Sequence, residues 1–511
     1  MTYDPQRGEL LCGNSGRLSH AAGPMADSVV AASGAHPADG TAPEAGQVPG
    51  RVALDAAQRA ERMSRAGPVA RRLAGAGVTM VALCWVDNTG VTRAKTVPLG
   101  RLERAAGWGV GMSPVFDVFL INDDITTSKY IGGPGGDLRL LPDLDRVTPL
   151  AGQPGWAWAP VDRYTQEGQA YAGCQRSFTR RMTDQAAEQG LELRMSFEVE
   201  WAVGTEDNGT FRPACAGPAY SMTRVVELSD YSREVVEALE RQGVTVEQFH
   251  PEYAAGQLEI SVAAADPVAA ADDNVLVRHT IRAVSARHGF QASFAPSVVA
   301  GTVGNGGHLH VSVWRDGQNL LAGGPGRHGL TGDGEAFAGG VLAELPALTA
   351  VGAPSAASYL RLVPSHWAGV FQCWGRENRE AALRLVTGSA GEQDIRANLE
   401  VKCFDLSANP YLAAGSVIAA GLAGIRSGAR LPAEIDGDPA ALTADELAGR
   451  GIRRLPQGLP EAAGCLERSP VLRRAMGDPL FEAFLAVRRA EADLFADASA
   501  DEIAAQTRWR W

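Results

Sequence analysis

A short run of alternating residues, Phe197 to Trp201, combines two carboxylates with three apolar side chains. If this run is a strand, Glu198 and Glu200 point to one face and the apolar side chains point to the other. Two neighbouring carboxylates repel each other and resist burial, so a buried pair needs a compensating cation. A single Glu-x-Glu pair is more typical of a half-buried strand with one solvated face.

The same alternation returns three more times, which changes that balance. Polar residues alternate with aliphatic ones in residues 257–262, 308–313 and 399–403, where they are Gln257, Glu259, Ser261, His308, His310, Ser312, Glu400 and Lys402. We expect these strands to lie in one sheet, with helices behind it and an open face in front. With Glu252, that face offers five carboxylates and two imidazoles. Such donors favour two or more Mg²⁺ or Mn²⁺ ions over a closed structural zinc.

The elements that must position these residues follow an α+β order. Residues 1–50 are rich in Gly, Ala, Pro and Ser and have no apolar periodicity, which predicts a disordered extension. Residues 51–165 predict a small α+β domain with a hairpin formed by residues 79–87 and 91–98. Residues 166–511 predict a larger domain, in which long helical connections join the strands and a helical tail follows.

Composition excludes several classes of function. The net charge of −12 argues against a nucleic acid or an anionic membrane as partner. The sequence shows neither an apolar run long enough to span a bilayer nor a signal pattern at its N-terminus. Its seven cysteines are scattered without a CxxC pair, which is typical of a reducing compartment. We therefore expect a cytoplasmic protein.

Six motifs in fixed order resemble the glutamine synthetase family over residues 79–495. They are Glu198-Val199-Glu200, Glu252 with Gly256-Gln257-Leu258-Glu259, Gly304-Asn305-Gly306-Gly307-His308-Leu309-His310, Tyr359-Leu360-Arg361-Leu362-Val363-Pro364, Asn378-Arg379 with Arg384, and Glu400-Val401-Lys402 followed by Asn409-Pro410-Tyr411. The resemblance implies an α+β fold: an N-terminal β-grasp-like domain and a catalytic domain with a curved antiparallel sheet backed by helices. It also implies a homododecamer with active sites between subunits.

The resemblance assigns a role to each motif residue. Glu200, Glu252 and Glu259 would hold one divalent metal ion, and Glu198, His308 and Glu400 would hold a second. Two arginines, Arg379 and Arg384, would contact the transferring phosphoryl group of ATP. Arg361 would bind the carboxylate of glutamate, beside His308 and Gly304. The nucleotide would be contacted by Glu247, His310 and Ser312. The implied reaction phosphorylates the γ-carboxylate of glutamate and then lets an amine displace phosphate. A flap over residues 361–367 would keep water from the acyl phosphate.

The sequence departs from the ammonia-using members of this family at the amine site. Trp367 stands where they carry a flap Glu, and the stretch 111–114 lacks the Asp that a neighbouring subunit supplies to ammonium. This favours a γ-glutamyl-amine ligase, whose amine is a polyamine, ethanolamine, an alkylamine or an arylamine. Lys402 replaces an Arg near the substrate acid and keeps its charge. The alternatives are a true glutamine synthetase that uses ammonia and a non-catalytic structural or regulatory relative.

Overall fold

The computed structural model describes residues 2–4, 9–11, 53–133 and 135–511, which fall into two units, residues 1–43 and residues 44–511. In the first unit β1 (Thr2–Asp4) and β2 (Glu9–Leu11) form an antiparallel pair. The extension predicted for residues 1–50 otherwise lies outside the described residues. All further elements belong to the second unit.

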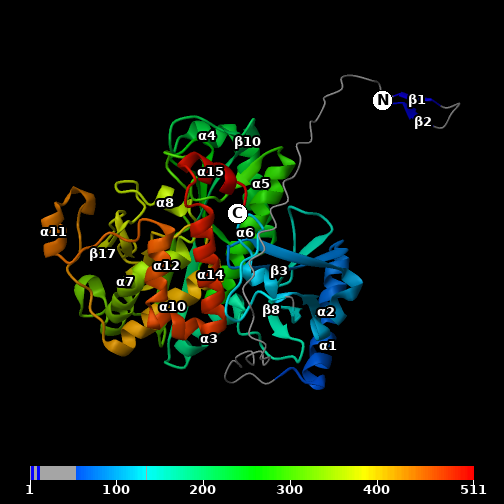
Figure 1. The fold of residues 1–511 in the computed structure, drawn as a ribbon, viewed down its shortest axis with the longest axis horizontal. Coiled ribbons are helices and arrows are strands. Elements are labelled where there is room, and N and C mark those ends of the chain that lie inside the picture. The colour runs from blue at the N-terminus through cyan, green and yellow to red at the C-terminus, as the bar shows by residue number, and fades with distance from the viewer. Residues whose placement is uncertain (1, 5–8, 12–52, 134) are drawn as a thin grey trace, which may run out of the picture. The chain divides into compact units, whose positions relative to one another are not determined.

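The first part of the second unit is a mixed sheet with two helices (Figure 1). Its strands are β3 (Met80–Val86), β4 (Thr92–Pro98), β5 (Val110–Met112), β6 (Leu138–Pro142), β7 (Thr148–Pro149) and β8 (Trp156–Thr165), in the order β4-β3-β8-β6-β5 with β7 beside β8. The helices are α1 (Ala56–Gly75), which begins with a capping box between Asp55 and Gln58, and α2 (Leu102–Trp108). The parallel β3–β8 pair at its centre gives the β-grasp-like arrangement that the sequence predicts.

The turn between β3 and β4 requires glycine. Gly90 has a φ of +79°, and a Cβ atom there would lie 1.9 Å from the carbonyl oxygen of Ser407. Only a residue without a side chain allows this close approach. The predicted hairpin is thus confirmed, and its tip packs on the loop that follows the last strand of the catalytic part.

The strands of the catalytic part form two sheets. One has the order β11-β10-β13-β12 with β14 beside β10, and the other has the order β16-β15-β19-β18-β17 with β9 beside β15. Their bounds are β9 (Glu192–Phe197), β10 (Val199–Asp207), β11 (Thr210–Pro213), β12 (Val246–Pro251), β13 (Gln257–Val262), β14 (Gln291–Ser293), β15 (Leu309–Arg315), β16 (Gln318–Asn319), β17 (Phe371–Arg376), β18 (Ala381–Val386) and β19 (Asn398–Val401).

Two features of these sheets differ from the prediction of one antiparallel sheet. The chain leaves one sheet and enters the other at Glu198, and a bridge between Met195 and Ala265 links the two. The β17–β18 pair is parallel. Residues of both sheets therefore line the same cavity. The α+β fold with a curved sheet is confirmed.

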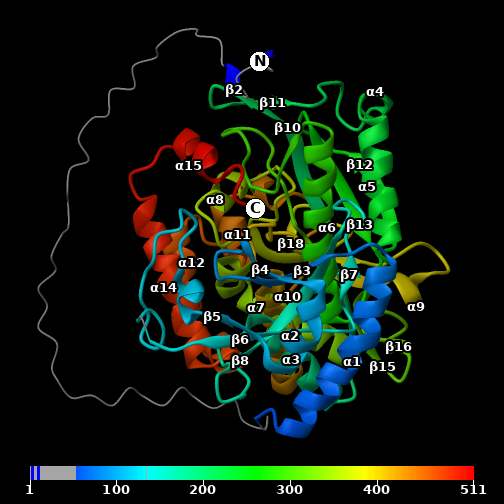
Figure 2. The ribbon, with the colours of Figure 1, turned by 90° about the vertical axis from the view of Figure 1, so that its right-hand side faces the viewer.

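Helices cover the backs of these sheets and fill the rest of the chain (Figure 2). They are α3 (Gln175–Ala187), α4 (Met222–Glu227), α5 (Ser229–Arg241), α6 (Pro267–Arg287), α7 (Gly332–Gly352), α8 (Ser358–Arg361), α9 (Gln393–Arg396), α10 (Pro410–Ser427), α11 (Ala444–Gly449), α12 (Leu459–Glu467), α13 (Pro470–Met476), α14 (Asp478–Leu494) and α15 (Ala500–Thr507). Helices α7 and α10 are apolar around most of their circumference, as expected for core helices, whereas α6 is mostly buried but carries several charged side chains. In the described part of the chain no helix has the length and apolar character needed to cross a membrane.

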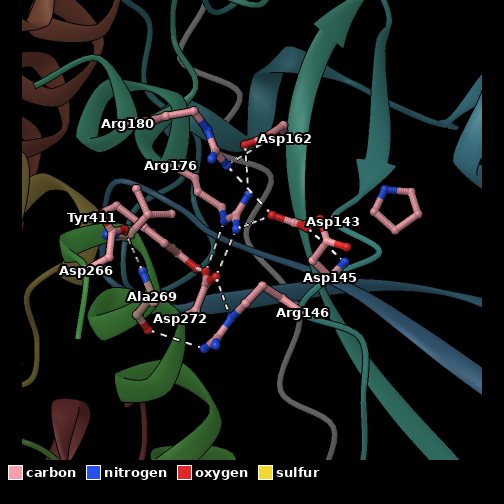
Figure 3. Close-up of polar contacts among 12 residues, drawn as sticks. Asp143, Asp145, Arg146, Asp162, Arg176, Arg180, Asp266, Ala269, Asp272 and Tyr411 are labelled. Carbon is pink, nitrogen blue, oxygen red and sulfur yellow. Dashed lines mark hydrogen bonds and ion pairs between the residues drawn. The ribbon is translucent and has the colours of Figure 1, made fainter. Parts of the chain in front are cut away.

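A buried ionic network ties the N-terminal sheet to the catalytic helices (Figure 3). Arg176 on α3 donates to both oxygens of Asp272 on α6, at 3.0 and 2.9 Å, to Asp143 at 2.7 Å and to Asp162 on β8 at 3.1 Å. The hydroxyl of Tyr411 donates to Asp272 at 2.6 Å. One guanidinium thus joins β8 and the loop after β6 to α3 and α6, so it fixes the two parts against each other.

Replacing Arg176 with Met should destabilise the protein strongly. It leaves the buried Asp272 carboxylate short of its main counter-charge, and removing one partner of a buried pair costs about 3–5 kcal/mol. The control is Arg65→Met, which breaks an exposed pair with Asp145 and should cost less than about 1 kcal/mol. Equal denaturation midpoints for the two variants would refute a central role for Arg176.

A second contact between the two parts depends on pH. Glu491 on α14 is fully enclosed, accepts the backbone N–H of Ile121 at 2.9 Å and lies 3.0 Å from Arg488. Burial raises the pKa of Glu491 from 4.5 to about 7, and the Arg488 charge opposes only part of that rise. A carboxyl group whose pKa is higher in the folded state stabilises the fold at low pH and loses this contribution as the pH rises through its folded pKa.

We expect Glu491→Gln to flatten the dependence of stability on pH. In the wild type, the titration of Glu491 should lower the free energy of unfolding by roughly 3 kcal/mol between about pH 4.5 and pH 7. The variant keeps an acceptor for Ile121 but does not titrate, so its melting temperature should fall less across this window. Glu467→Gln removes an exposed ion pair with Arg489 and should leave the slope unchanged. Parallel profiles for Glu491→Gln and wild type would contradict this assignment.

Candidate active site

Glu198 lies where the chain passes from β9 to β10, and this position aims its carboxylate at β15 and β19. Its backbone N–H donates to the carbonyl of His308 at 3.0 Å. His308 Nδ1 lies 2.7 Å from Glu198 Oε2 and 3.1 Å from Glu400 Oε1. The ligand atoms of these three residues lie within 4.8 Å of one another. The structure thus gathers all three residues that were assigned to the second metal ion.

A second group of donors forms across β12 and β13. His250, Glu252 and Glu259 also have ligand atoms within 4.8 Å of one another. His250 pairs with Glu259 in the strand register, and its Nε2 lies 3.2 Å from Glu259 Oε1. Glu200 pairs with Glu259 from the other side and lies between the two groups, 4.0 Å from His308 Nε2. Sequence reasoning placed Glu200, Glu252 and Glu259 together but missed His250, although its place two residues before Glu252 on a strand was a usable signal.

The glycine-rich loop before β15 allows these groups to approach one another. A Cβ atom on Gly306 would lie 2.5 Å from His308 Nε2 and 2.6 Å from Glu200 Oε1, and one on Gly304 would lie 2.0 Å from a backbone oxygen. The amide of Gln257 holds the loop, because it donates to Glu200 at 2.9 Å and to the Gly304 carbonyl at 3.0 Å. The loop therefore needs glycine for space.

Fixed cations compensate part of the negative charge. Glu400 is only 1% exposed and lies 3.0 Å from Lys402 Nζ and 3.1 Å from Arg384. Arg361 is buried beside them and donates to the Lys402 carbonyl at 3.0 Å, while its Nη1 has no partner among the described residues. Arg379 is exposed at the rim and likewise makes no hydrogen bond or ion pair within the described part. Arg379 is therefore free to bind an anionic group of a substrate, and Arg361 keeps one donor, Nη1, without a partner.

The pKa values of these carboxylates and histidines depend strongly on their charged neighbours and on burial. Burial alone would raise the pKa of Glu400, but Lys402 and the two histidines hold it well below its usual range. Burial would lower the pKa of His310, yet Glu198 raises it to about 9. The hydrogen bond to Glu259 raises the pKa of His250 to about 9, and burial raises that of Glu259 to about 7. The group on β12 and β13 therefore holds protons that a metal ion would displace.

One cavity of about 620 Å³ gathers most of the predicted site. Its lining includes Glu198, Glu200, Glu252, Glu259, Gly304, His308, Arg361, Trp367, Arg379, Arg384, Glu400 and Lys402. Glu247, His310 and Ser312 line a neighbouring cavity of about 410 Å³ instead, together with Arg396. Glu198 and Ser261 line both. The residues predicted to bind nucleotide thus lie next to the residues predicted to bind metal and acid.

The flap carries a feature that the sequence did not reveal. Trp367 has a φ of +56°, and its backbone N–H donates to Glu380 at 2.8 Å. Its ring stands 5.5 Å from that of Tyr253, and the two residues are 45% and 47% exposed. A left-handed conformation is costly for a bulky residue and often marks a functional position. Both residues line the cavity, so the Tyr253–Trp367 pair forms an aromatic wall on one side of it.

The structure also accounts for Asp117, the acidic residue nearest to the expected ammonium-binding stretch. It is buried and lies 2.7 Å from Arg163, and Tyr171 donates to it at 3.0 Å. Both oxygens of this carboxylate have partners within the N-terminal part. It is therefore not available to bind ammonium in a neighbouring subunit.

The donor sets fit divalent metal ions. Each set combines two carboxylates with one imidazole, and Glu200 adds a further carboxylate between them. Oxygen donors with a minority of nitrogen suit Mg²⁺ or Mn²⁺. An α+β fold that presents such donors beside free arginines over a cavity defines a metal-dependent enzyme that acts on anionic substrates.

Comparisons with known proteins place this enzyme in a family. Residues 172–505 match the model of the glutamine synthetase catalytic domain. A gamma-glutamylpolyamine synthetase of Streptomyces coelicolor is 58% identical over 89% of this chain and 98% of its own, and a glutamine synthetase of Halobacterium salinarum is 32% identical over 81% and 90%. Among solved structures, a glutamine synthase homologue has a TM-score of 0.74 at 35% identity, and a GmaS complex with ADP has 0.74 at 27%. Each covers 84% of this chain and 97% of its own.

The chain belongs to the glutamine synthetase family and is a ligase of that family. Enzymes of this family use ATP and divalent metal ions.

Both donor groups should make stability depend on divalent metal. We expect the melting temperature of the wild type to rise with Mg²⁺ or Mn²⁺, because an ion that binds only the folded state adds about 2.7 kcal/mol at 100 times its Kd. Glu198→Gln and Glu259→Gln should each reduce this increment. Without metal, Glu259→Gln should melt no lower than wild type, because the substitution relieves repulsion.

The control for this experiment is Glu192→Gln, an exposed position on β9. It should respond to metal as the wild type does. An increment that survives both site substitutions would show that the ions bind elsewhere.

Proposed function

We propose that this protein is an ATP-dependent ligase that joins the γ-carboxylate of glutamate to a polyamine. The observation that carries the proposal is the composition of the larger cavity: Arg361, Arg379 and Arg384 line it together with two donor groups and with Trp367, which stands at the flap position where the resemblance places a Glu in ammonia-using enzymes, beside Tyr253. The relative from Streptomyces coelicolor, which is a gamma-glutamylpolyamine synthetase by name, supports the choice of amine.

The proposed reaction has two steps. The γ-carboxylate of glutamate attacks the γ-phosphorus of ATP, the bond to the ADP oxygen breaks, and an acyl phosphate forms. The amine nitrogen then attacks the acyl carbon, loses a proton and displaces inorganic phosphate. Divalent ions, held by the two donor groups, would neutralise phosphate charge in the first step.

The cations of the site have separate tasks in this proposal. Arg361, which lines the cavity and has an unpartnered Nη1, would hold the α-carboxylate of glutamate beside Gly304. Arg379 and Arg384 would neutralise the transferring phosphoryl group. Lys402 stays paired with Glu400 and compensates its negative charge. Glu247, His310 and Ser312 would contact the nucleotide from the neighbouring cavity.

The Tyr253–Trp367 pair would recognise the amine. A polyamine carries a second ammonium group several carbons from the reacting nitrogen. Aromatic faces attract such a group by about 0.5–2 kcal/mol, depending on its desolvation. Two carboxylates support the same end of the flap: Glu380 accepts the Trp367 N–H, and Asp438 accepts the Ser365 hydroxyl at 2.7 Å. The pair is half exposed, so the rest of the polyamine can extend toward solvent.

The supporting context is consistent with an enzyme of the cytoplasm that works as a homo-oligomer. The six cysteines in the described part form no disulfide, and five of them are buried. Resemblance to ring-forming enzymes supports an assembly with active sites between subunits. We propose a dodecamer, which light scattering of the purified protein can test.

A panel of amines tests the proposed function. Phosphate release with ATP, Mg²⁺ and glutamate should be faster with 1,4-diaminobutane or spermidine than with butylamine, ethanolamine, aniline or ammonia. Butylamine is the matched control for diaminobutane, because it differs only by the distal amine. We expect a ratio of kcat/KM between them of about 10, within the range that cation–π contacts provide.

Trp367→Ala should lower that ratio toward 1, whereas Trp367→Phe should keep part of it. Trp108→Ala, at a similarly exposed tryptophan in the N-terminal part, should leave the ratio unchanged. Equal rates with both amines would refute polyamine recognition and keep the ligase. Ammonia as the best substrate would favour a glutamine synthetase. No phosphate release with any amine would favour a non-catalytic role.

A further inference from the structure

A small cavity lined by cations lies away from the catalytic site. It has a volume of about 40 Å³ and lies between α6, the β3–β4 turn at Gly90 and the last two residues, Arg510 and Trp511. Three residues of α6 line it, namely Arg278, His279 and Arg282, and the two arginines provide its charge. We call these three residues with their cavity the basic pocket. It shares no lining residue with either cavity of the active site.

The cations of the basic pocket have unused donors. Arg278 is only 5% exposed and donates one N–H to the Leu406 carbonyl at 2.8 Å. Its Nε and its other terminal nitrogen are buried without a hydrogen-bond partner in the described part of the chain, and so are His279 Nε2 and one terminal nitrogen of Arg282. A buried polar atom without a partner costs free energy that a bound ligand would recover.

No carboxylate of the described residues offsets this charge. Arg278 and Arg282 form no ion pair there, and Arg282 has only the ring of Phe294, 5.5 Å away. Arg510 at the rim is already paired with Asp123 at 3.4 Å. Burial, together with Arg282, lowers the pKa of Arg278 to about 9, and the same burial with both arginines lowers that of His279 to about 3. Repulsion of this kind between positions i and i+4 of a helix destabilises it unless an anion lies between them.

We propose that the basic pocket binds a small oxyanion of the size and charge of inorganic phosphate or sulfate. Two guanidinium groups line the pocket, and their planar forks suit oxyanions. Its volume accommodates a single small ion rather than an organic ligand. An ion there would also connect α6 to the β3–β4 turn and to the end of the chain, so it would stabilise the junction between the N-terminal and catalytic parts.

Equilibrium dialysis of the full-length protein with labelled phosphate, without nucleotide or divalent metal, tests this proposal. Arg282→Gln should weaken phosphate binding at one site per chain by about tenfold or more, as expected for the loss of a charged donor. Arg282→Lys keeps the charge and should retain part of the affinity. Arg287→Gln is the matched control, because this arginine lies on the same helix but pairs with Glu234 at the surface.

Two further measurements separate this site from others. Arg379→Gln weakens the anion-binding side of the active site, and the binding that depends on Arg282 should persist in that variant. A crystal soaked in selenate should show an anomalous peak within the basic pocket. Unchanged phosphate binding in Arg282→Gln would overturn the proposal. The proposal would also be overturned if Arg282→Gln formed a smaller assembly in light scattering while its phosphate binding stayed unchanged. That result would mean that a side chain of a second copy fills the pocket.

Discussion

Concentrated negative charge is the constraint around which the catalytic part is built. Five carboxylates line one cavity, and Glu400, the most deeply buried of them, has fixed cations in Lys402 and Arg384. The other carboxylates lie mainly beside histidines, with Gln257 and Arg361 near Glu200, so part of their negative charge is left uncompensated, and a buried uncompensated charge is costly. A site of this kind attracts divalent ions because its own residues leave the charge unbalanced. The scaffold must then hold the carboxylates against their mutual repulsion.

The curvature of the sheets provides that resistance. Glu198 sits between strands of two sheets, so its carboxylate meets His308 and Glu400 from one side while Glu200 meets Glu259 from the other. Neighbouring strands of one sheet already bring His250 and Glu259 within 3.2 Å of each other, and the break at Glu198 adds donors from the second sheet to the same cavity. The ionic network around Arg176 holds the N-terminal sheet against α3 and α6. Rigidity far from the cavity therefore supports the geometry within it.

The sequence predicted what alternation determines and missed what long-range packing determines. The faces of the strands placed Glu198, His308 and Glu400 correctly, because period-two alternation fixes which side a residue takes. It did not predict that the strands divide between two sheets, since a break at a single residue leaves the alternation intact. His250 was missed although it lies two residues before Glu252, because a single histidine on a strand does not by itself indicate a metal ligand, and only the pairing of β12 with β13 places it beside Glu259. Arg278 and Arg282 look like an ordinary solvated helix face in sequence, and only packing against the β3–β4 turn buries them.

The replacement of charge by aromatic rings at the flap changes what the enzyme must desolvate. A small ammonium ion loses its whole hydration shell on entering a cavity, so it needs carboxylates close by to recover that cost. In the proposed reaction, a polyamine leaves its distal ammonium at the half-exposed Tyr253–Trp367 pair, where water still reaches it and the cation–π attraction costs little desolvation. Asp117 instead forms a buried ion pair with Arg163 in the N-terminal part. Under the proposed function, the aromatic wall and the absence of a carboxylate at the flap both follow from the larger size of the amine.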